Sequence, residues 1–374
     1  MAIINDLNSP EVRRKLEHRL RAAFPGGDML RITDLEVPPS GLSFQTLKLT
    51  VEREIDGRTS RQKLVARVEP LPGAGIFREY DLEREVRVLQ ALQGSRVPVP
   101  RIHFYEAEPT VLGAPFAVME HLPGRAPADS PSYMRQGWVL DLSPDQRRCI
   151  WTNALRVVAD LHAVDWEGLG LDWLARPELG LTPVDQQIAY YEWTQAWGSA
   201  GHANPTVDAT FVWLKANRPS DPEPVVLAWG DAKPGNMLYA DNLTVAGALD
   251  FEMAALASPE LDLGWWLFAH RYHAATLEGG TVPSGILSRE EVIDGYQEMS
   301  GHEVRHAFFY EVLGGLRVAV LADRGYRMMM AAGLLPPDHA APANNAATQA
   351  LAAMLDLPAP DGINDIHEFE APSS

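Results

Sequence analysis

Alternation of apolar and polar residues in the first third of the chain predicts antiparallel β-strands. The strand-like stretches are residues 29–37, 44–55 and 61–69. Asp56-Gly57 separates the second stretch from the third, and an Asp-Gly pair between two such runs is a strong hairpin signal. Two further strand-like stretches follow at 98–106 and 110–124. Together these stretches predict a small antiparallel sheet.

Apolar residues recur at helical spacing in the rest of the chain. A first helix is expected from Ser9-Pro10 to about Pro25, because Ser caps helices and Pro suits their first turn. The stretch YDLEREVRVLQAL at 80–92 has one apolar face and predicts a second helix. Beyond residue 124 most stretches are helical: 144–164, 183–199, 206–217, 259–274, 289–299, 302–333 and an Ala-rich piece ending near 356.

The change from strands to helices predicts two domains. A chain of 374 residues is long for a single domain, and the tripeptide LPG at 122–124 is suited to a linker. We therefore expect a strand-rich lobe over 1–122 and a helical lobe over 123–357. Residues 358–374 contain prolines and acidic residues and are expected to form a mobile tail.

Composition restricts the possible partners. The chain has 50 acidic and 32 basic residues, a formal charge of −18, which makes nucleic acid an unsuitable partner. This charge favours either solubility alone or an acidic surface that faces a cationic substrate. The N-terminus lacks the apolar core of a signal peptide, no apolar run approaches the length of a membrane span, and Cys149 is the only cysteine. We expect a cytoplasmic protein without a membrane partner.

One turn concentrates the candidate chemistry. Residues 227–239 read LAWGDAKPGNMLY and place Asp231, Lys233 and Asn236 between two strand-like runs. A second strand, TVAGALDFE, would bring Asp250 near Asn236 through a hairpin. An amide oxygen beside a carboxylate suits Mg²⁺, which takes few protein ligands and completes its shell with water and phosphate.

The two remaining side chains suit phosphoryl transfer. Asp231 would face the metal and accept the proton of a substrate hydroxyl that attacks phosphorus. The ammonium of Lys233 would neutralise charge on the phosphoryl group during transfer. Asp231 and Lys233 are therefore the candidate catalytic residues, and Asn236 and Asp250 the candidate metal ligands.

These motifs resemble those of the aminoglycoside-phosphotransferase-like small-molecule kinases, within the protein-kinase-like superfamily. The resemblance is carried by GDAKPGNML, by ALDFE and by the following Asp262-Leu263 pair. Weaker similarities are LHAVDW at 161–166, REVRVLQAL followed by VPVP, and PFAVMEHLPG. The resemblance implies an α+β, two-lobed protein-kinase-like fold with a small antiparallel-sheet N-lobe and a mostly helical C-lobe. It also implies ATP and Mg²⁺ as cofactors, with GTP as the alternative nucleotide.

The resemblance also implies nucleotide contacts in the first lobe. The turn PPSGLSFQT would offer Ser40, Gly41 and Ser43 to phosphate, although an ordinary hairpin turn explains this stretch equally well. The adenine would lie near the backbone of Glu120 and Leu122 at the hinge.

Two positions depart from the family pattern. Trp229 replaces a His that often precedes Gly-Asp, and we expect it to change packing under the loop. Arg67 occupies the strand position where a protein kinase has its phosphate-pairing Lys. An Arg can bind phosphate bidentately, with Glu85 as its ion-pair partner. Lys63 and Arg61 are the alternatives.

The acceptor is expected to be a small molecule with a hydroxyl group. Only about a dozen residues separate Asp250 from Asp262, too few for a segment that docks polypeptides. The family suggests an aminoglycoside, an amino alcohol, a sugar or a hydroxy acid. Asp262 would brace the catalytic loop, and Glu252 would either bind the metal or only form a hydrogen bond.

Two other functions remain as alternatives. The first is a nucleotide-binding pseudokinase, against which the complete set of base and metal-ligand side chains argues. The second is a zinc metalloprotease, because HEVRH at 302–306 matches the H-E-x-x-H pattern. Ser300 and Glu303 have the spacing of a capping box, which would use that Glu to begin a helix instead.

Overall fold

The computed structural model describes residues 9–24, 30–38, 43–55, 57–220, 223–277 and 279–362. The described residues form two compact units, and the main division falls between Leu122 and Pro123. Gly94–Pro98 is an exception, because this short loop groups with the second unit. There the backbone N–H of Ala248 donates to the carbonyl of Pro98 at 2.6 Å. Most of the tail expected at 358–374 lies outside the described residues.

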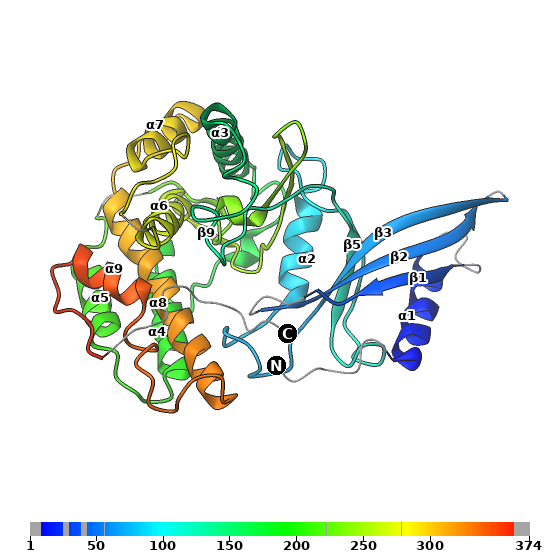
Figure 1. The fold of residues 1–374 in the computed structure, drawn as a ribbon, viewed down its shortest axis with the longest axis horizontal. Helices are drawn as coiled ribbons and strands as arrows, with labels where there is room; N and C mark the ends of the chain where they lie inside the picture. The colour runs from blue at the N-terminus through cyan, green and yellow to red at the C-terminus, as the bar shows by residue number, and fades with distance from the viewer. Residues whose placement is uncertain are drawn as a thin grey trace. The chain divides into compact units, whose positions relative to one another are not determined.

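The first unit is built on a five-stranded antiparallel sheet in the order β1-β2-β3-β5-β4 (Figure 1). Its strands are β1 (Arg31–Glu36), β2 (Gln45–Ile55), β3 (Arg58–Val68), β4 (Ile102–Glu106) and β5 (Phe116–Glu120). β2 and β3 pair without interruption from Ile55↔Arg58 to Gln45↔Val68. Gly57, in the turn that joins them, has a φ of +70°. The hairpin predicted from Asp-Gly is confirmed.

Helices α1 (Pro10–Ala23) and α2 (Leu82–Ala91) cover opposite faces of this sheet. Ser9 and Asp81 cap them by accepting backbone N–H bonds in the first turn. One apolar core joins α1 to the sheet and includes Leu16, Leu20, Leu49, Leu64, Ala66 and Val68. Side chains alternate along β3, so Arg67 points to the other face, where it meets Glu85 of α2.

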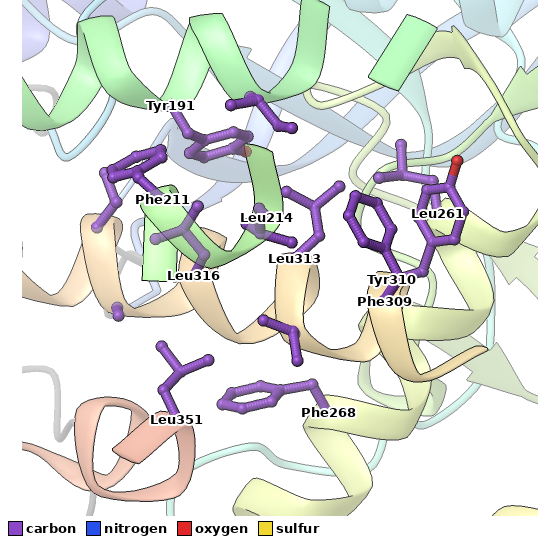
Figure 2. Packing of buried hydrophobic residues seen from close by; sticks show 14 of the residues in the cluster. Tyr191, Phe211, Leu214, Leu261, Phe268, Phe309, Tyr310, Leu313, Leu316 and Leu351 are labelled. Atoms are coloured by element: carbon purple, nitrogen blue, oxygen red, sulfur yellow. The ribbon is translucent and has the colours of Figure 1, made fainter. Parts of the chain in front are cut away.

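The second unit is mostly helical. Its helices are α3 (Pro144–His162), α4 (Pro183–Gly198), α5 (Pro205–Ala216), α6 (Glu260–Ala275), α7 (Arg289–Ser300), α8 (Ala307–Ala331) and α9 (Ala346–Met354). Figure 2 shows α8 at the centre, with side chains of α4 and α5 on one side, and Phe268 of α6 and Leu351 of α9 on the other. In the described part of the chain, no helix is both long enough and apolar enough to cross a membrane. The predicted α+β fold class is confirmed.

Two short strand pairs hold the stretch that contains the candidate chemistry. β6 (Val226–Ala228) pairs with β9 (Ala255–Ala257), and β7 (Met237–Tyr239) pairs with β8 (Val245–Ala248). A 3₁₀ turn at Pro234–Asn236 leads into β7. The predicted strand over 244–252 is therefore shorter than expected, and β9 was not predicted.

The helix predicted from residue 302 begins only at Ala307. Gly301 ends α7 with a φ of +72°, and Ser300 is the last residue of that helix, so the predicted capping box is wrong. The carboxylate of Glu260 accepts the backbone N–H groups of Arg305 (2.8 Å) and His306 (2.7 Å). These bonds hold the intervening segment in a non-helical conformation, which the sequence pattern did not reveal.

Candidate active site

A sharp turn after β6 sets the direction of the candidate catalytic loop. Gly230 has a φ of +86°, and a Cβ at this position would lie 2.1 Å from the carbonyl oxygen of Met253. No residue with a side chain fits there without displacing backbone. Trp229 is fully buried, stacks on Phe251 at 4.8 Å and donates from its ring to the carbonyls of Leu249 and Asp250. Trp229 thus packs under the loop.

Asp262 of α6 braces the same turn. Its carboxylate accepts the backbone N–H groups of Trp229 and Gly230, each at 2.7 Å. His162 of α3 lies 2.9 Å from the same carboxylate and 2.7 Å from the hydroxyl of Tyr296. The Asp262 side chain is fully buried. These polar contacts balance its charge, which makes the position of the loop sensitive to Asp262.

Asp231 follows the turn and is held by a tryptophan. Trp265 of α6 donates its ring N–H to Oδ1 of Asp231 at 2.6 Å. Burial raises the pKa of Asp231 above its ordinary value, and Asp250 raises it further, against the opposite effect of Lys233. A carboxylate with a raised pKa is a stronger base, which suits proton abstraction.

Lys233 lies between two carboxylates. Its Nζ is 2.8 Å from Oδ2 of Asp129 and 3.4 Å from Oδ1 of Asp231. Burial opposes the charge of Lys233, but the two carboxylates outweigh burial and raise its pKa. Burial likewise opposes the charge of Asp129, yet Lys233 and His273 outweigh it and lower the pKa of Asp129. Lys233 and Asp129 are therefore an ion pair at neutral pH.

The hairpin formed by β7 and β8 brings the two candidate metal ligands to one place. The amide of Asn236 donates to the carbonyl of Asp231 at 2.9 Å, which turns its oxygen away from that bond. Leu249 donates its N–H to the carbonyl of Asn236 at 3.0 Å, so Asp250 follows directly beside this turn. Asp250 has a φ of +68°, a conformation that non-glycine residues rarely adopt and that recurs at functional sites.

Asn236 and Asp250 together suit Mg²⁺ better than they suit a metal ion whose ligands all come from the protein. In the described ranges, no three His, Cys, Asp or Glu side chains gather as a metal cluster. One amide and one carboxylate leave most coordination positions to water and phosphate, as Mg²⁺ at nucleotide sites prefers.

The first unit contains the predicted ion pair for the phosphates. Nη1 of Arg67 lies 3.0 Å from Oε1 of Glu85, and the Glu85 side chain is almost fully buried. The Arg67 guanidinium also lies 4.7 Å above the ring of Phe44. Lys63, on the same strand, is exposed. Arg67 is thus the cation of β3 that α2 holds in place.

The other predicted nucleotide contacts are less fully described. Ser40 and Gly41 lie outside the described residues, whereas Ser43 lies two residues before the start of β2. Glu120 is the last residue of β5, and Leu122 lies at the division between the units. Their roles stay predictions.

Sequence reasoning missed three residues that contact the candidate catalytic loop. Asp129 and Arg317 come from distant segments, and no local pattern marked them. Arg317 is almost fully buried, donates to the carbonyl of Gly230 at 2.7 Å and lies 4.6 Å from the ring of Trp265. Trp265 carried a usable signal, because it follows Asp262 by three residues and so shares its helix face.

The H-E-x-x-H segment does not form the geometry of a zinc protease. Residues 302–306, all of them described, lack the helix that would place both imidazoles on one face. His302 Nε2 instead lies 3.6 Å from Oε1 of Glu260, and Glu303 pairs with Arg305 at 2.7 Å. The segment serves to connect α7 to α8.

The chain is similar in sequence to known proteins. The model of the phosphotransferase enzyme family (APH) matches residues 34–304. Acyl-CoA dehydrogenase family member 11 of Rattus norvegicus is 29% identical over 254 residues, which are 67% of this chain and 30% of that protein. The chain thus matches less than a third of the length of this relative.

Solved structures share the fold. A provisionally assigned aminoglycoside phosphotransferase from Ralstonia eutropha superposes with a TM-score of 0.65 at 24% identity, over 91% of this chain and 95% of that one. A thermostable mutant of aminoglycoside phosphotransferase APH(4)-Ia, in complex with ADP and hygromycin B, gives 0.56 at 14% identity, over 91% and 98%.

Proposed function

The chain belongs to the phosphotransferase enzyme family, and from this premise we propose that it transfers the γ-phosphate of ATP to a hydroxyl group of a small molecule. One observation carries the proposal. A largely buried carboxylate with a raised pKa, Asp231, lies on the same turn as the ammonium of Lys233 and the amide of Asn236, and Asp250 follows directly beside this turn. A base, a cation and a metal site are the parts that phosphoryl transfer needs.

In this mechanism the acceptor hydroxyl gives its proton to Asp231 while its oxygen attacks the γ-phosphorus. The bond between that phosphorus and the oxygen bridging to the β-phosphate breaks, and ADP leaves. Trp265 occupies Oδ1 of Asp231, so the other carboxylate oxygen is the one that accepts the proton. Lys233 stabilises the negative charge on the phosphoryl group in transit.

Mg²⁺ and the nucleotide draw on further residues. Asn236 and Asp250 would hold the ion, which neutralises phosphate charge when it is bound. Arg67, oriented by Glu85, would bind phosphate oxygens with its guanidinium fork. The complex of APH(4)-Ia with ADP supports an adenine nucleotide as the donor, and GTP is the alternative to test.

The acceptor is tested by ADP release over a panel of small hydroxyl compounds. The panel should hold aminoglycosides, amino alcohols, sugars, and hydroxy acids with their CoA thioesters, the last because the relative is named an acyl-CoA dehydrogenase. We expect Mg-dependent ADP release with one class, and a phosphorylated product of matching mass. Retained ATP binding without turnover across the panel would support the pseudokinase alternative instead.

Loss of either metal ligand is expected to weaken Mg-dependent nucleotide binding. Asn236→Ala and Asp250→Ala each remove one of only two protein oxygens from the proposed site. Thermal-shift titration with ATP, with and without Mg²⁺, should show that both variants lose most of the stabilisation that depends on Mg²⁺. Wild-type Mg·ATP stabilisation in both variants would exclude this site.

The role of Arg67 is tested by a graded pair of variants. Arg67→Ala should raise the KM for ATP by roughly tenfold or more, because a charge-assisted phosphate contact and the partner of buried Glu85 are both lost. Arg67→Lys should be intermediate, since it keeps a charge but not the fork. Equal kinetics in wild type and both variants would show that another residue binds the phosphate, and Lys63 would be the next residue to replace.

A further inference from the structure

Asp129 is the acidic residue closest to the ammonium of Lys233. Its Oδ2 lies 2.8 Å from Lys233 Nζ, whereas Oδ1 of Asp231 lies 3.4 Å from the same atom. Asp129 comes from the segment before α3, about a hundred residues from the catalytic loop in sequence. Lys233 therefore makes its shorter ion pair with a residue outside the loop that carries it.

Asp129 is itself held in place by buried groups. Its Oδ1 lies 3.4 Å from Nε2 of His273, whose ring is almost fully buried. Nδ1 of His273 lies 3.0 Å from the hydroxyl of Ser132. Gly235 leaves space for this carboxylate, because a Cβ there would lie 2.6 Å from Oδ1 of Asp129. These contacts fix Asp129, while its side chain stays 40% exposed.

The arrangement matters because Lys233 has two anionic neighbours and one of them is the proposed base. A Lys side chain is flexible, and attraction between opposite charges rises steeply at short distance. If Asp129 lost its charge, Asp231 would be the remaining carboxylate in contact with Lys233. The ammonium would then move onto Asp231 and away from the position proposed for the transferred phosphoryl group.

We propose that Asp129 is a positioning residue, which holds the ammonium of Lys233 away from Asp231 and directs it to the transferred phosphoryl group. The inference rests on the proposed function of this site. Asp129 acts through Lys233 and does not itself touch the reacting atoms.

A double-mutant cycle separates this role from a structural one. With the best acceptor of the panel, Asp129→Asn should lower kcat by about 10- to 100-fold, as expected for a misplaced catalytic group, with the KM for ATP little changed. In a Lys233→Met background the same change should alter kcat by less than about twofold, because no ammonium is left to position. Asp129→Glu keeps the charge and should restore most of kcat. Losses that add in the double variant, or no rescue by Glu, would overturn the proposal.

A structural measurement tests the same point without turnover. Crystal structures of wild type and Asp129→Asn should show Lys233 Nζ moving from 3.4 Å to hydrogen-bond distance of Asp231. An unmoved Lys233 would overturn the positioning role even if the enzyme is active. Absence of ADP release in wild type would instead contradict the proposed function. The movement of Lys233 in the Asp129→Asn structure would still test the role of Asp129.

Discussion

Replacing Asp231 with asparagine is expected to lower kcat by about 10²- to 10⁴-fold, the usual contribution of a positioned general base. An amide of the same shape cannot accept the hydroxyl proton. It can still accept the ring N–H of Trp265, so the geometry of the loop should persist. ADP release at saturating ATP and acceptor measures kcat, and thermal shift with Mg·ATP should give near wild-type binding.

Stability should not fall in this variant. Burial raises the pKa of Asp231, which means that the fold disfavours its charged form relative to the unfolded chain. A neutral asparagine should therefore leave the unfolding midpoint unchanged or raise it, in keeping with the trade-off between stability and activity at catalytic sites. Asp241→Asn, at an exposed turn between β7 and β8, is the matched control and should keep wild-type turnover. Retained turnover in Asp231→Asn would make Asp231 a structural residue.

The parts of the fold that the sequence predicted well depend on local chemistry. The Asp-Gly pair produced the β2–β3 hairpin, and the cap at Ser9 produced the start of α1. The candidate loop was found for the same reason. Asp231, Lys233 and Asn236 lie within six residues, so one turn brings them together whatever the rest of the chain does.

What the sequence missed depends on contacts between distant segments. Asp129 reaches Lys233 only because separate parts of the second unit pack together. Helix α8 begins five residues later than its apolar pattern suggested, because Glu260 competes for the backbone N–H groups of Arg305 and His306. Neither effect has a signature in the neighbouring sequence.

The second large effect is expected when Asp262 is replaced by alanine. Two backbone N–H groups, of Trp229 and Gly230, would lose their acceptor, and buried His162 would lose its carboxylate partner. Removing one member of a buried network of this kind costs about 3–5 kcal/mol. We expect the free energy of unfolding of the second unit to fall by that amount. Urea unfolding followed by tryptophan fluorescence is a suitable measurement, because Trp229 lies in the affected turn.

Asp262→Asn and Asp294→Ala complete this experiment. Asp262→Asn keeps one acceptor oxygen, so this variant should lose less stability than Asp262→Ala. Asp294 is exposed on α7, and its replacement by alanine should change the free energy of unfolding by less than about 0.5 kcal/mol. Since Asp262 fixes the turn that carries Asp231, its replacement by alanine should lower both stability and kcat, unlike Asp231→Asn, which should lower kcat alone. An Asp262→Ala variant as stable as the Asp294 control would show that the turn keeps its shape without this carboxylate.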